Sequence, residues 1–146
     1  MNRLAILIVL VLAGVLCMAQ GDSDVPAYHS QPPRAGEKLP PILPKDALWG
    51  ESFQQPYQVH AYELAAKIPG VLYQLPCYCY CDRGMGHKSL RSCFEGTHGA
   101  HCATCMKELF YAYQQTKLKK TTPQVREGIL KGEWRNIDLD QAVSMN

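Results

Sequence analysis

Apolar positions recur at helical spacing after residue 55 of the 146-residue chain, and they predict where its helices lie. The first pattern opens after Pro56, which stands at a helix entrance. The apolar residues that follow at helical spacing are Val59, Tyr62 and Ala66, with Ala61, Leu64 and Ala65 beside them. An Ile-Pro-Gly sequence at 68–70 predicts the end of this helix, because proline and glycine interrupt periodic segments.

A stronger pattern predicts a helix from about Cys102 to Lys119. Its apolar stripe consists of Met106, Leu109, Phe110 and Tyr113. Its last turn is predicted to carry three lysines, where the helix dipole favours cations. These are Lys117, Lys119 and Lys120.

Two shorter helices are predicted to follow. Thr122 is the expected N-cap of the first, with Pro123 at the first helical position. Its apolar residues are Val125, Ile129 and Leu130. Asp138 or Asp140 is expected to cap a final helix that carries Ala142 and Val143. The chain shows no internal repeat and no alternating strand pattern outside its cysteine segment, so the predicted fold class is small and mainly α.

The N-terminus predicts export. Arg3 precedes an apolar run from Leu4 to Leu16, which is shorter than the roughly 20 residues of a membrane-spanning helix and suits a signal peptide. Cleavage after Ala19 gives a signal peptide of residues 1–19. Two alternatives stay open, lipid attachment at Cys17 and an uncleaved membrane anchor, and Leu16 disfavours the first. In every case the rest of the chain lies outside the cytoplasm, in the periplasm or the extracellular space, and a membrane is a partner only in the two alternatives.

Residues 20–45 predict a flexible linker. Six prolines stand here among polar residues, so the segment neither forms a helix nor buries a core. The predicted folded domain spans residues 46–146.

Composition excludes some functions. The formal net charge is only +2, with no strongly basic half, so nucleic acid is not expected as a partner. Seven cysteines in 146 residues disfavour an ordinary cytosolic enzyme. Cleavage after Ala19 leaves six of them, an even number.

The cysteines and two histidines carry the predicted chemistry. The candidate ligands are Cys77, Cys79, Cys81, His87, Cys93, His98, Cys102 and Cys105. In the Pro-Cys-Tyr-Cys-Tyr-Cys segment at 76–81, an extended backbone puts all three sulfurs on one face, and a bent one lets them converge on one ion. A Cys-x-x-Cys pair such as 102–105 is typical of structural zinc sites, and thiolates also select Cu(I). A glycine-rich loop, poor in apolar residues, joins the two groups and needs metal or disulfides to hold its shape.

Two other interpretations of the same cysteines stay open. Six cysteines in an exported domain often form three disulfides, giving a stapled interaction module, although cysteines one residue apart rarely pair. A thiol–disulfide oxidoreductase is the third interpretation, since Cys102 at a helix N-terminus would have a lowered pKa. The missing strand–helix pattern disfavours it. Attached haem is excluded, because Met106 and not histidine follows Cys105.

The cysteine segment also resembles a known family. Residues 76–81 are similar to the motif that names the PCYCGC family of small exported bacterial proteins, many of them lipoproteins. Further matches are Gly-His-Lys at 86–88, Cys-Phe at 93–94 and His-Gly-Ala at 98–100, followed by Cys102 and Cys105. The likeness covers about residues 61–113. Tyr80 stands where the motif has glycine, and Cys17 lacks a good lipobox. The resemblance implies no defined biochemical role, but it places His98 on the motif's histidine and His101 on a variable position.

Together these observations predict a signal peptide, a proline-rich tether and a compact helical domain that binds a soft metal ion. We favour Cu(I) over Zn(II), in metal transfer or sensing without catalysis. An exported or membrane protein is a candidate partner. His29 and His60 are expected to be incidental.

Overall fold

The structure, a computed structural model, describes residues 24–146. The predicted signal peptide, Cys17 and the first residues of the predicted linker lie outside this range. Within it the elements are α-helices and 3-10 helices (η), without a strand. In chain order they are η1 (Lys45–Ala47), α2 (Pro56–Ala65), α3 (Pro69–Leu72), α4 (Cys81–Met85), η2 (Leu90–Phe94), η3 (Thr97–His101), α5 (Ala103–Lys117), α6 (Thr122–Leu130), η4 (Glu133–Asn136) and α7 (Leu139–Ala142). The predicted mainly helical fold class is confirmed.

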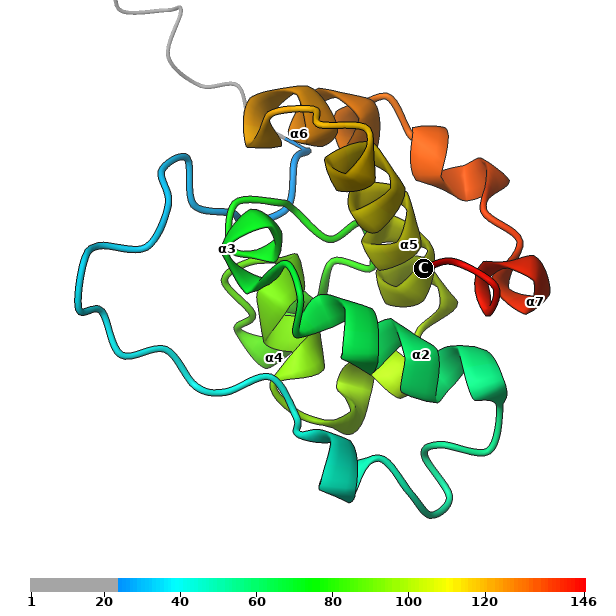
Figure 1. The fold of residues 1–146 in the computed structure, drawn as a ribbon. Coiled ribbons are helices and arrows are strands. Elements are labelled where there is room, and N and C mark those ends of the chain that lie inside the picture. The colour runs from blue at the N-terminus through cyan, green and yellow to red at the C-terminus, as the bar shows by residue number, and fades with distance from the viewer. Residues whose placement is uncertain (1–23) are drawn as a thin grey trace, which may run out of the picture.

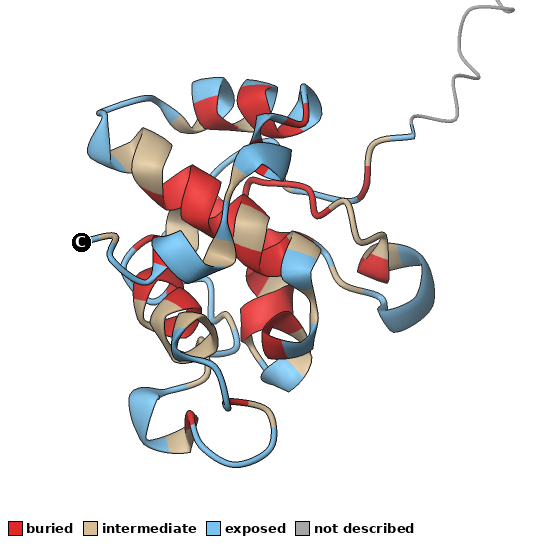
Figure 2. Cartoon of the chain, turned by 90° about the vertical axis from the view of Figure 1, so that its right-hand side faces the viewer, coloured by how far each residue is buried: buried red, intermediate tan, exposed pale blue. Residues whose placement is uncertain are grey.

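Helix α5 is the centre of the fold (Figure 1). It contacts α2, α6 and α7, as well as the short helices η2, η3 and η4. The predicted stripe of Met106, Leu109, Phe110 and Tyr113 is buried, and Figure 2 shows the buried stretch along the helix. Because this stripe packs against several neighbours, helix α5 is held firmly in the fold. Its N-terminal end, which carries the Cys-x-x-Cys pair, is held in place with it.

The predicted helix after Pro56 is α2, with Pro56 at its start and a capping box between Gln55 and Gln58. Tyr62 and its neighbours are buried, but Ala66 is exposed, since it is the C-cap residue beyond the last turn. The Ile-Pro-Gly sequence ends this helix as predicted, and Pro69 then opens α3. Proline fits the first turn of a helix because the backbone N–H that it lacks would have no intrahelical acceptor there.

Three details of the C-terminal helices differ from the prediction. Thr121, and not Thr122, is the N-cap of α6, because the Gln124 side chain accepts a hydrogen bond from the Thr121 backbone N–H in a capping box. Only Lys117 of the three lysines lies in α5, since Lys119 has left-handed backbone angles and ends the helix. Of the two predicted caps of α7, Asp138 accepts the capping hydrogen bonds.

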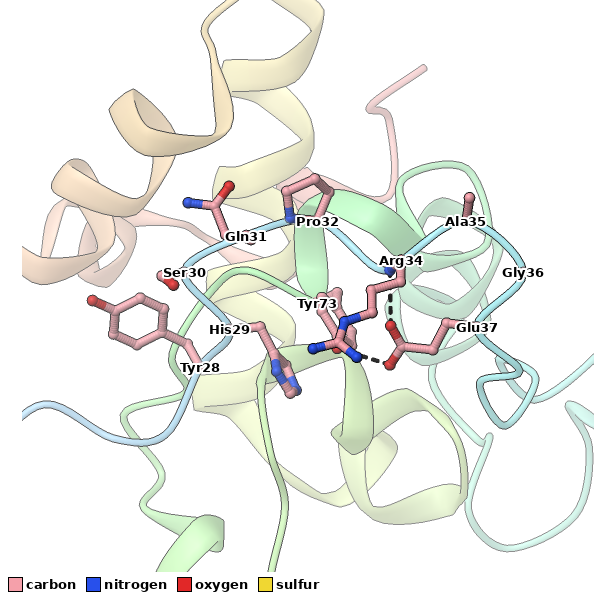
Figure 3. A pocket seen from close by; sticks show the side chains of 10 residues that line it. All are labelled: Tyr28, His29, Ser30, Gln31, Pro32, Arg34, Ala35, Gly36, Glu37 and Tyr73. Atoms are coloured by element: carbon pink, nitrogen blue, oxygen red, sulfur yellow. Dashed lines mark hydrogen bonds between the residues drawn. The ribbon is translucent and has the colours of Figure 1, made fainter.

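Residues 24–44 form an arm without helix or strand, which crosses the surface of the helical domain. The His29 ring stacks on Tyr73 at 3.8 Å between centroids, and Glu37 accepts a hydrogen bond from the Tyr73 hydroxyl. These contacts line a cavity of about 930 Å³ under the arm (Figure 3). The cysteines within residues 24–146 do not line this cavity, so it is separate from the thiol-rich region. The boundary at Asp46 stays a prediction.

None of the helices between residues 24 and 146 combines the length and the apolar character that a membrane span needs.

Candidate metal centre

The cysteine segment at 76–81 is bent. Of the extended and the bent backbone considered from the sequence, the structure has the bent one. Residues 77–80 form a turn in which the Tyr80 N–H donates to the Cys77 carbonyl, at 3.1 Å. Tyr80 then takes left-handed backbone angles, with φ 56°, and α4 begins at Cys81. Left-handed angles favour glycine. Tyr80 therefore makes the bend that glycine would make at the same position of the resembled motif.

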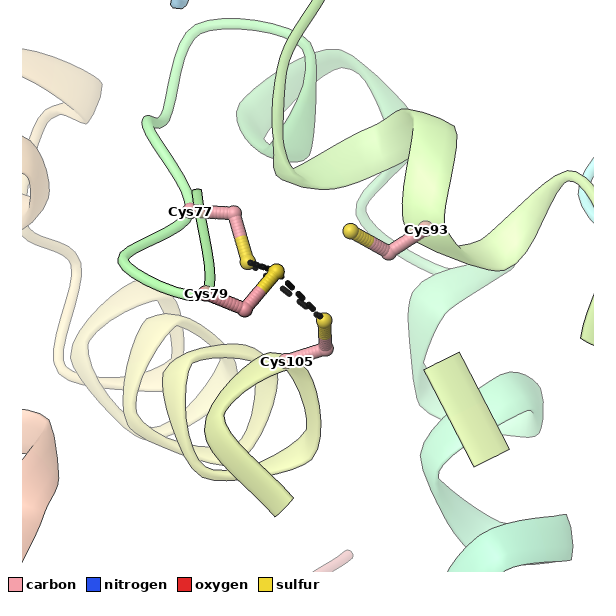
Figure 4. Close-up of side chains that lie close together, drawn as sticks. All are labelled: Cys77, Cys79, Cys93 and Cys105. Carbon is pink, nitrogen blue, oxygen red and sulfur yellow. Dashed lines mark hydrogen bonds between the residues drawn. The ribbon is translucent and has the colours of Figure 1, made fainter. Parts of the chain in front are cut away.

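One side of the cluster is a triangle of sulfurs from two segments (Figure 4). The Cys77 and Cys79 sulfurs are 3.3 Å apart, Cys105 lies 3.4 Å from Cys77, and it lies 3.6 Å from Cys79. Cys105 belongs to the first turn of α5, and Cys102 is its N-cap. An ion at the centre of the triangle would be about 2 Å from each sulfur, so a shift of a few tenths of an ångström gives the ~2.3 Å of a metal–thiolate bond.

The opposite side is built from α4, η2 and the two histidines. The Cys81 and Cys93 sulfurs are 3.5 Å apart, and His87 Nδ1 lies 3.4 Å from the Cys93 sulfur. His98 Nε2 lies 3.9 Å from the Cys79 sulfur and so joins the two sides. The rings of His87 and His98 meet edge to face, at 5.1 Å between centroids.

Three sets of four side chains have donor atoms within 4.8 Å of one another, so the cluster can hold a metal ion. The sets are Cys77, Cys79, Cys93 and Cys105; Cys79, Cys81, Cys93 and His98; and Cys79, His98, Cys102 and Cys105. Together they contain seven of the eight candidate ligands, and His87 joins through its contact with Cys93. All eight sequence-predicted residues are therefore gathered in one place.

The other histidines lie elsewhere. His101 Nε2 is 2.9 Å from the Ser52 hydroxyl, and His60 Nε2 is 2.7 Å from the Met145 carbonyl. His29, which lies in the arm, stacks on Tyr73. None of the three belongs to a set that could hold an ion.

The loop that carries His98 is held by a buried tyrosine. The Tyr62 hydroxyl donates to the Gly96 carbonyl at 2.6 Å and accepts from the Ala100 N–H at 3.2 Å, which fixes η3 on both sides of His98. Gly99 is needed for close packing, because a Cβ there would lie 2.9 Å from the Cys93 carbonyl oxygen. Helix η3 thus packs tightly against η2, and this brings His98 toward the sulfurs of the cluster.

Apolar anchors in the loop were underestimated from the sequence. Leu90 and Phe94 of η2 are fully buried, so the loop is a series of short helices tied to the core. The predicted glycine-rich loop is present, yet packing contributes to its order beside any cross-link.

The cluster has a buried floor and a half-buried rim. Cys77, Cys81, Cys93 and Cys105 are buried, whereas Cys79, His87, His98 and Cys102 are half-buried. A small ion can reach the rim from solvent, and the floor excludes water from its other side. Burial and the nearby His98 lower the pKa of His87, so its imidazole stays in the neutral form that binds metals.

Hydrogen bonds among the thiols shift the pKa values of different cysteines in opposite directions. Contacts with Cys102, Cys105 and Cys77 lower the pKa of Cys79, which is the thiol best placed to carry a negative charge. Hydrogen bonding to Cys102 and to other thiols of the cluster, together with burial, raises the pKa of Cys105. Crowded thiols ionise together only when a cation compensates their charge, so this arrangement suits metal binding.

The N-terminus of α5 does not produce the low thiol pKa expected at Cys102. Its hydrogen bond with Cys105 lowers the pKa, but hydrogen bonding to Cys79 and partial burial outweigh this, and the net pKa of Cys102 is raised. This result corrects the expectation that motivated the oxidoreductase interpretation.

Sequence reasoning missed Glu108. This carboxyl is fully buried one turn after Cys105 in α5, and its Oε1 accepts the Tyr78 N–H at 2.8 Å inside the cysteine turn. Its Oε2 has no partner, and burial raises the pKa of Glu108 to about 8. The helical period gave a signal, since Cys105, Glu108 and Leu109 share one face of the helix.

The six cysteines between residues 77 and 105 are free thiols.

No curated protein and no solved structure matches the chain at a significant level. The model of the family described as "protein of unknown function with PCYCGC motif" matches residues 6–131. The chain therefore belongs to the PCYCGC-motif family.

Proposed function

We propose that this protein binds a soft metal ion outside the cytoplasm, with Cu(I) preferred over Zn(II), and that it transfers or senses the ion without catalysing a reaction. One observation carries the proposal. Six thiols and two imidazoles, spread over residues 77–105, converge on one cluster, although nothing in the packing of a small helical domain requires six sulfurs together. Buried thiols in such number are most simply explained as ligands.

The donor set supports Cu(I). Sulfur outnumbers nitrogen six to two, and thiolates favour soft ions such as Cu(I). The triangle of Cys77, Cys79 and Cys105 offers a three-sulfur environment, which Cu(I) accepts readily. A structural zinc site is normally tetrahedral with four ligands.

The half-buried rim supports transfer or sensing. A site that only stabilises a fold is usually closed, whereas Cys79, Cys102 and the two histidines face the accessible side of this one. An exported or membrane protein can take the ion there by ligand exchange. Export itself is supported by Arg3 and the apolar run from Leu4 to Leu16.

A competition experiment tests the metal. The purified mature protein is reduced, loaded with Zn(II), and titrated with Cu(I) against a chelator of known affinity, while free thiols are counted by alkylation in the same samples. We expect Cu(I) to displace Zn(II) and to protect the thiols from alkylation. Retention of Zn(II) against Cu(I) would contradict the copper preference.

The same experiment separates the disulfide interpretation, which has its own support. The sulfurs of Cys77 and Cys105, and those of Cys81 and Cys93, are already neighbours, so oxidation can link them. Protein purified without reductant that contains neither metal nor free thiols would favour a disulfide-stapled module. Activity on protein disulfides by a readily reduced pair would favour the oxidoreductase.

A further inference from the structure

The three sets of donor atoms overlap in a regular way. Cys79 belongs to all three sets. Cys93, Cys105 and His98 each belong to two of them. Cys77, Cys81 and Cys102 each belong to one. The cluster is thus three adjoining coordination positions around a common sulfur.

No single ion can use these donors together. Cys77, Cys81 and Cys102 belong to three different sets. An ion bound to one of these cysteines therefore leaves the other two without a metal. One metal ion takes at most four ligands of this kind, and eight candidate donors are gathered here. A second ion would use the donors that the first one leaves.

The central sulfur is suited to bridging. Cys79 lies 3.3 Å from the Cys77 sulfur and 3.6 Å from the Cys105 sulfur on one side, and 3.9 Å from His98 Nε2 on the other. It is one of the half-buried residues of the rim, and it contacts the buried Cys77 and Cys105 of the floor. A thiolate has several lone pairs and can bind two ions at once, and this lets neighbouring ions share it without moving the backbone.

We infer that the cluster binds more than one ion per chain, as a polynuclear Cu(I)–thiolate centre in which the Cys79 sulfur is the bridging ligand. This inference rests on the proposed function and adds the number and arrangement of the ions. One ion lies in the triangle of Cys77, Cys79 and Cys105. The next lies between Cys79 and the pair Cys81–Cys93, with His98 beside it. Each thiol loses its proton to solvent as the ion binds, and no electron transfer is needed.

Stoichiometry tests the inference on the full mature protein. The reduced protein is titrated with Cu(I), the ions per chain are counted by native mass spectrometry, and X-ray absorption is used to look for copper–copper scattering. We expect two or three ions per chain with a copper–copper path. One ion per chain without this path would overturn the inference and leave the proposed function standing. No bound ion would overturn both.

Two serine variants locate the bridge. Cys79→Ser removes the ligand that all three positions share, whereas Cys102→Ser removes a ligand of one position and is also half-buried, so it is the matched control. We expect Cys102→Ser to keep at least two ions with copper–copper scattering and Cys79→Ser to lose that scattering. Circular dichroism shows whether each variant is folded. Equal behaviour of the two folded variants would reject Cys79 as the bridge.

Discussion

His98 and His101 lie three residues apart, yet they have different partners. His98 Nε2 approaches the Cys79 sulfur, whereas His101 is exposed and bonded to Ser52. Each histidine stands four residues before a cysteine, so spacing alone did not choose between them. The family motif chose His98, and the structure places only that ring in the cluster.

We therefore expect His98→Ala to weaken metal retention about tenfold or more, because it removes a donor shared by two coordination positions. His101→Ala is the matched control and should retain metal like the unmodified protein. Both variants are dialysed against a graded chelator series, and the metal that remains is measured. Equal losses, or a greater loss in His101→Ala, would reject the assignment.

Glu108 gives a prediction about pH. Its pKa is raised from 4.5 to about 8 by burial, so the charged carboxylate is disfavoured in the folded state. The unfolded chain loses this proton first, so Glu108 adds a negative slope to the free energy of unfolding of the metal-free protein as pH rises from about 4.5 to about 8.

Glu108→Gln should flatten that slope, because the amide oxygen still accepts the Tyr78 N–H and carries no charge. Glu51→Gln makes the same chemical change at an exposed position and serves as the control. Urea unfolding of the reduced, metal-free proteins across this pH range measures the effect. Parallel slopes in the Glu108→Gln variant and the unmodified protein would contradict the prediction.

At the scale of elements, periodicity found the longer helices and missed the short ones around the cysteine cluster. Helices α2 and α5 were predictable because several turns repeat an apolar stripe, such as Met106, Leu109 and Phe110. Helix α4 and the 3-10 helices η2 and η3 span five residues each, too few for a period to show. Their positions depend on tertiary contacts instead, for example the two hydrogen bonds of Tyr62.

The turn before α4 carries a prediction of its own. Tyr80 occupies left-handed backbone angles, which cost a non-glycine residue about 1–2 kcal/mol. Its ring contacts offset part of this cost, since the Arg83 guanidinium lies 4.2 Å from the ring centroid and the hydroxyl donates to the Asp24 carbonyl. The contact with Asp24 could not be predicted from local sequence, because the two residues are 56 positions apart.

Replacing Tyr80 by Gly and by Ala separates the backbone from the ring. Both variants lose the ring, but only glycine adopts the left-handed angles without strain. We expect Tyr80→Gly to be more stable than Tyr80→Ala by about 1 kcal/mol in denaturant unfolding. Equal stability of the two variants would show that the turn relaxes to other backbone angles.

On the scale of the whole molecule, the candidate site was more predictable than the way the fold holds it. The ability to bind a metal depends on residue type, so the candidate cysteines and histidines could be identified from the sequence. Their pairing in space depends on how η2, η3 and the first turn of α5 meet, and no local pattern encodes that meeting. The buried Glu108, which holds the cysteine turn onto α5, is part of the same long-range arrangement.

The last prediction concerns the contribution of metal to stability. Leu90 and Phe94 anchor the short helices between Cys81 and Cys102, and ligand bonds between separate segments should add to the order that this packing supplies. Metal that binds only the folded state stabilises it by about 4 kcal/mol when the free ion is at a thousand times its dissociation constant. For a domain of roughly 100 residues this corresponds to a shift in melting temperature of about 15 °C or more.

A strong Cu(I) chelator should therefore lower the melting temperature of the loaded protein by that amount, because binding energy is folding energy at such a site. Reductant alone should change the melting temperature little, because reductants cleave disulfides and not metal–thiolate bonds. Thermal unfolding is followed by circular dichroism, with the alkylated protein as a control that cannot bind metal. If chelator changes nothing while reductant unfolds the protein, disulfides and not metal hold the cluster together.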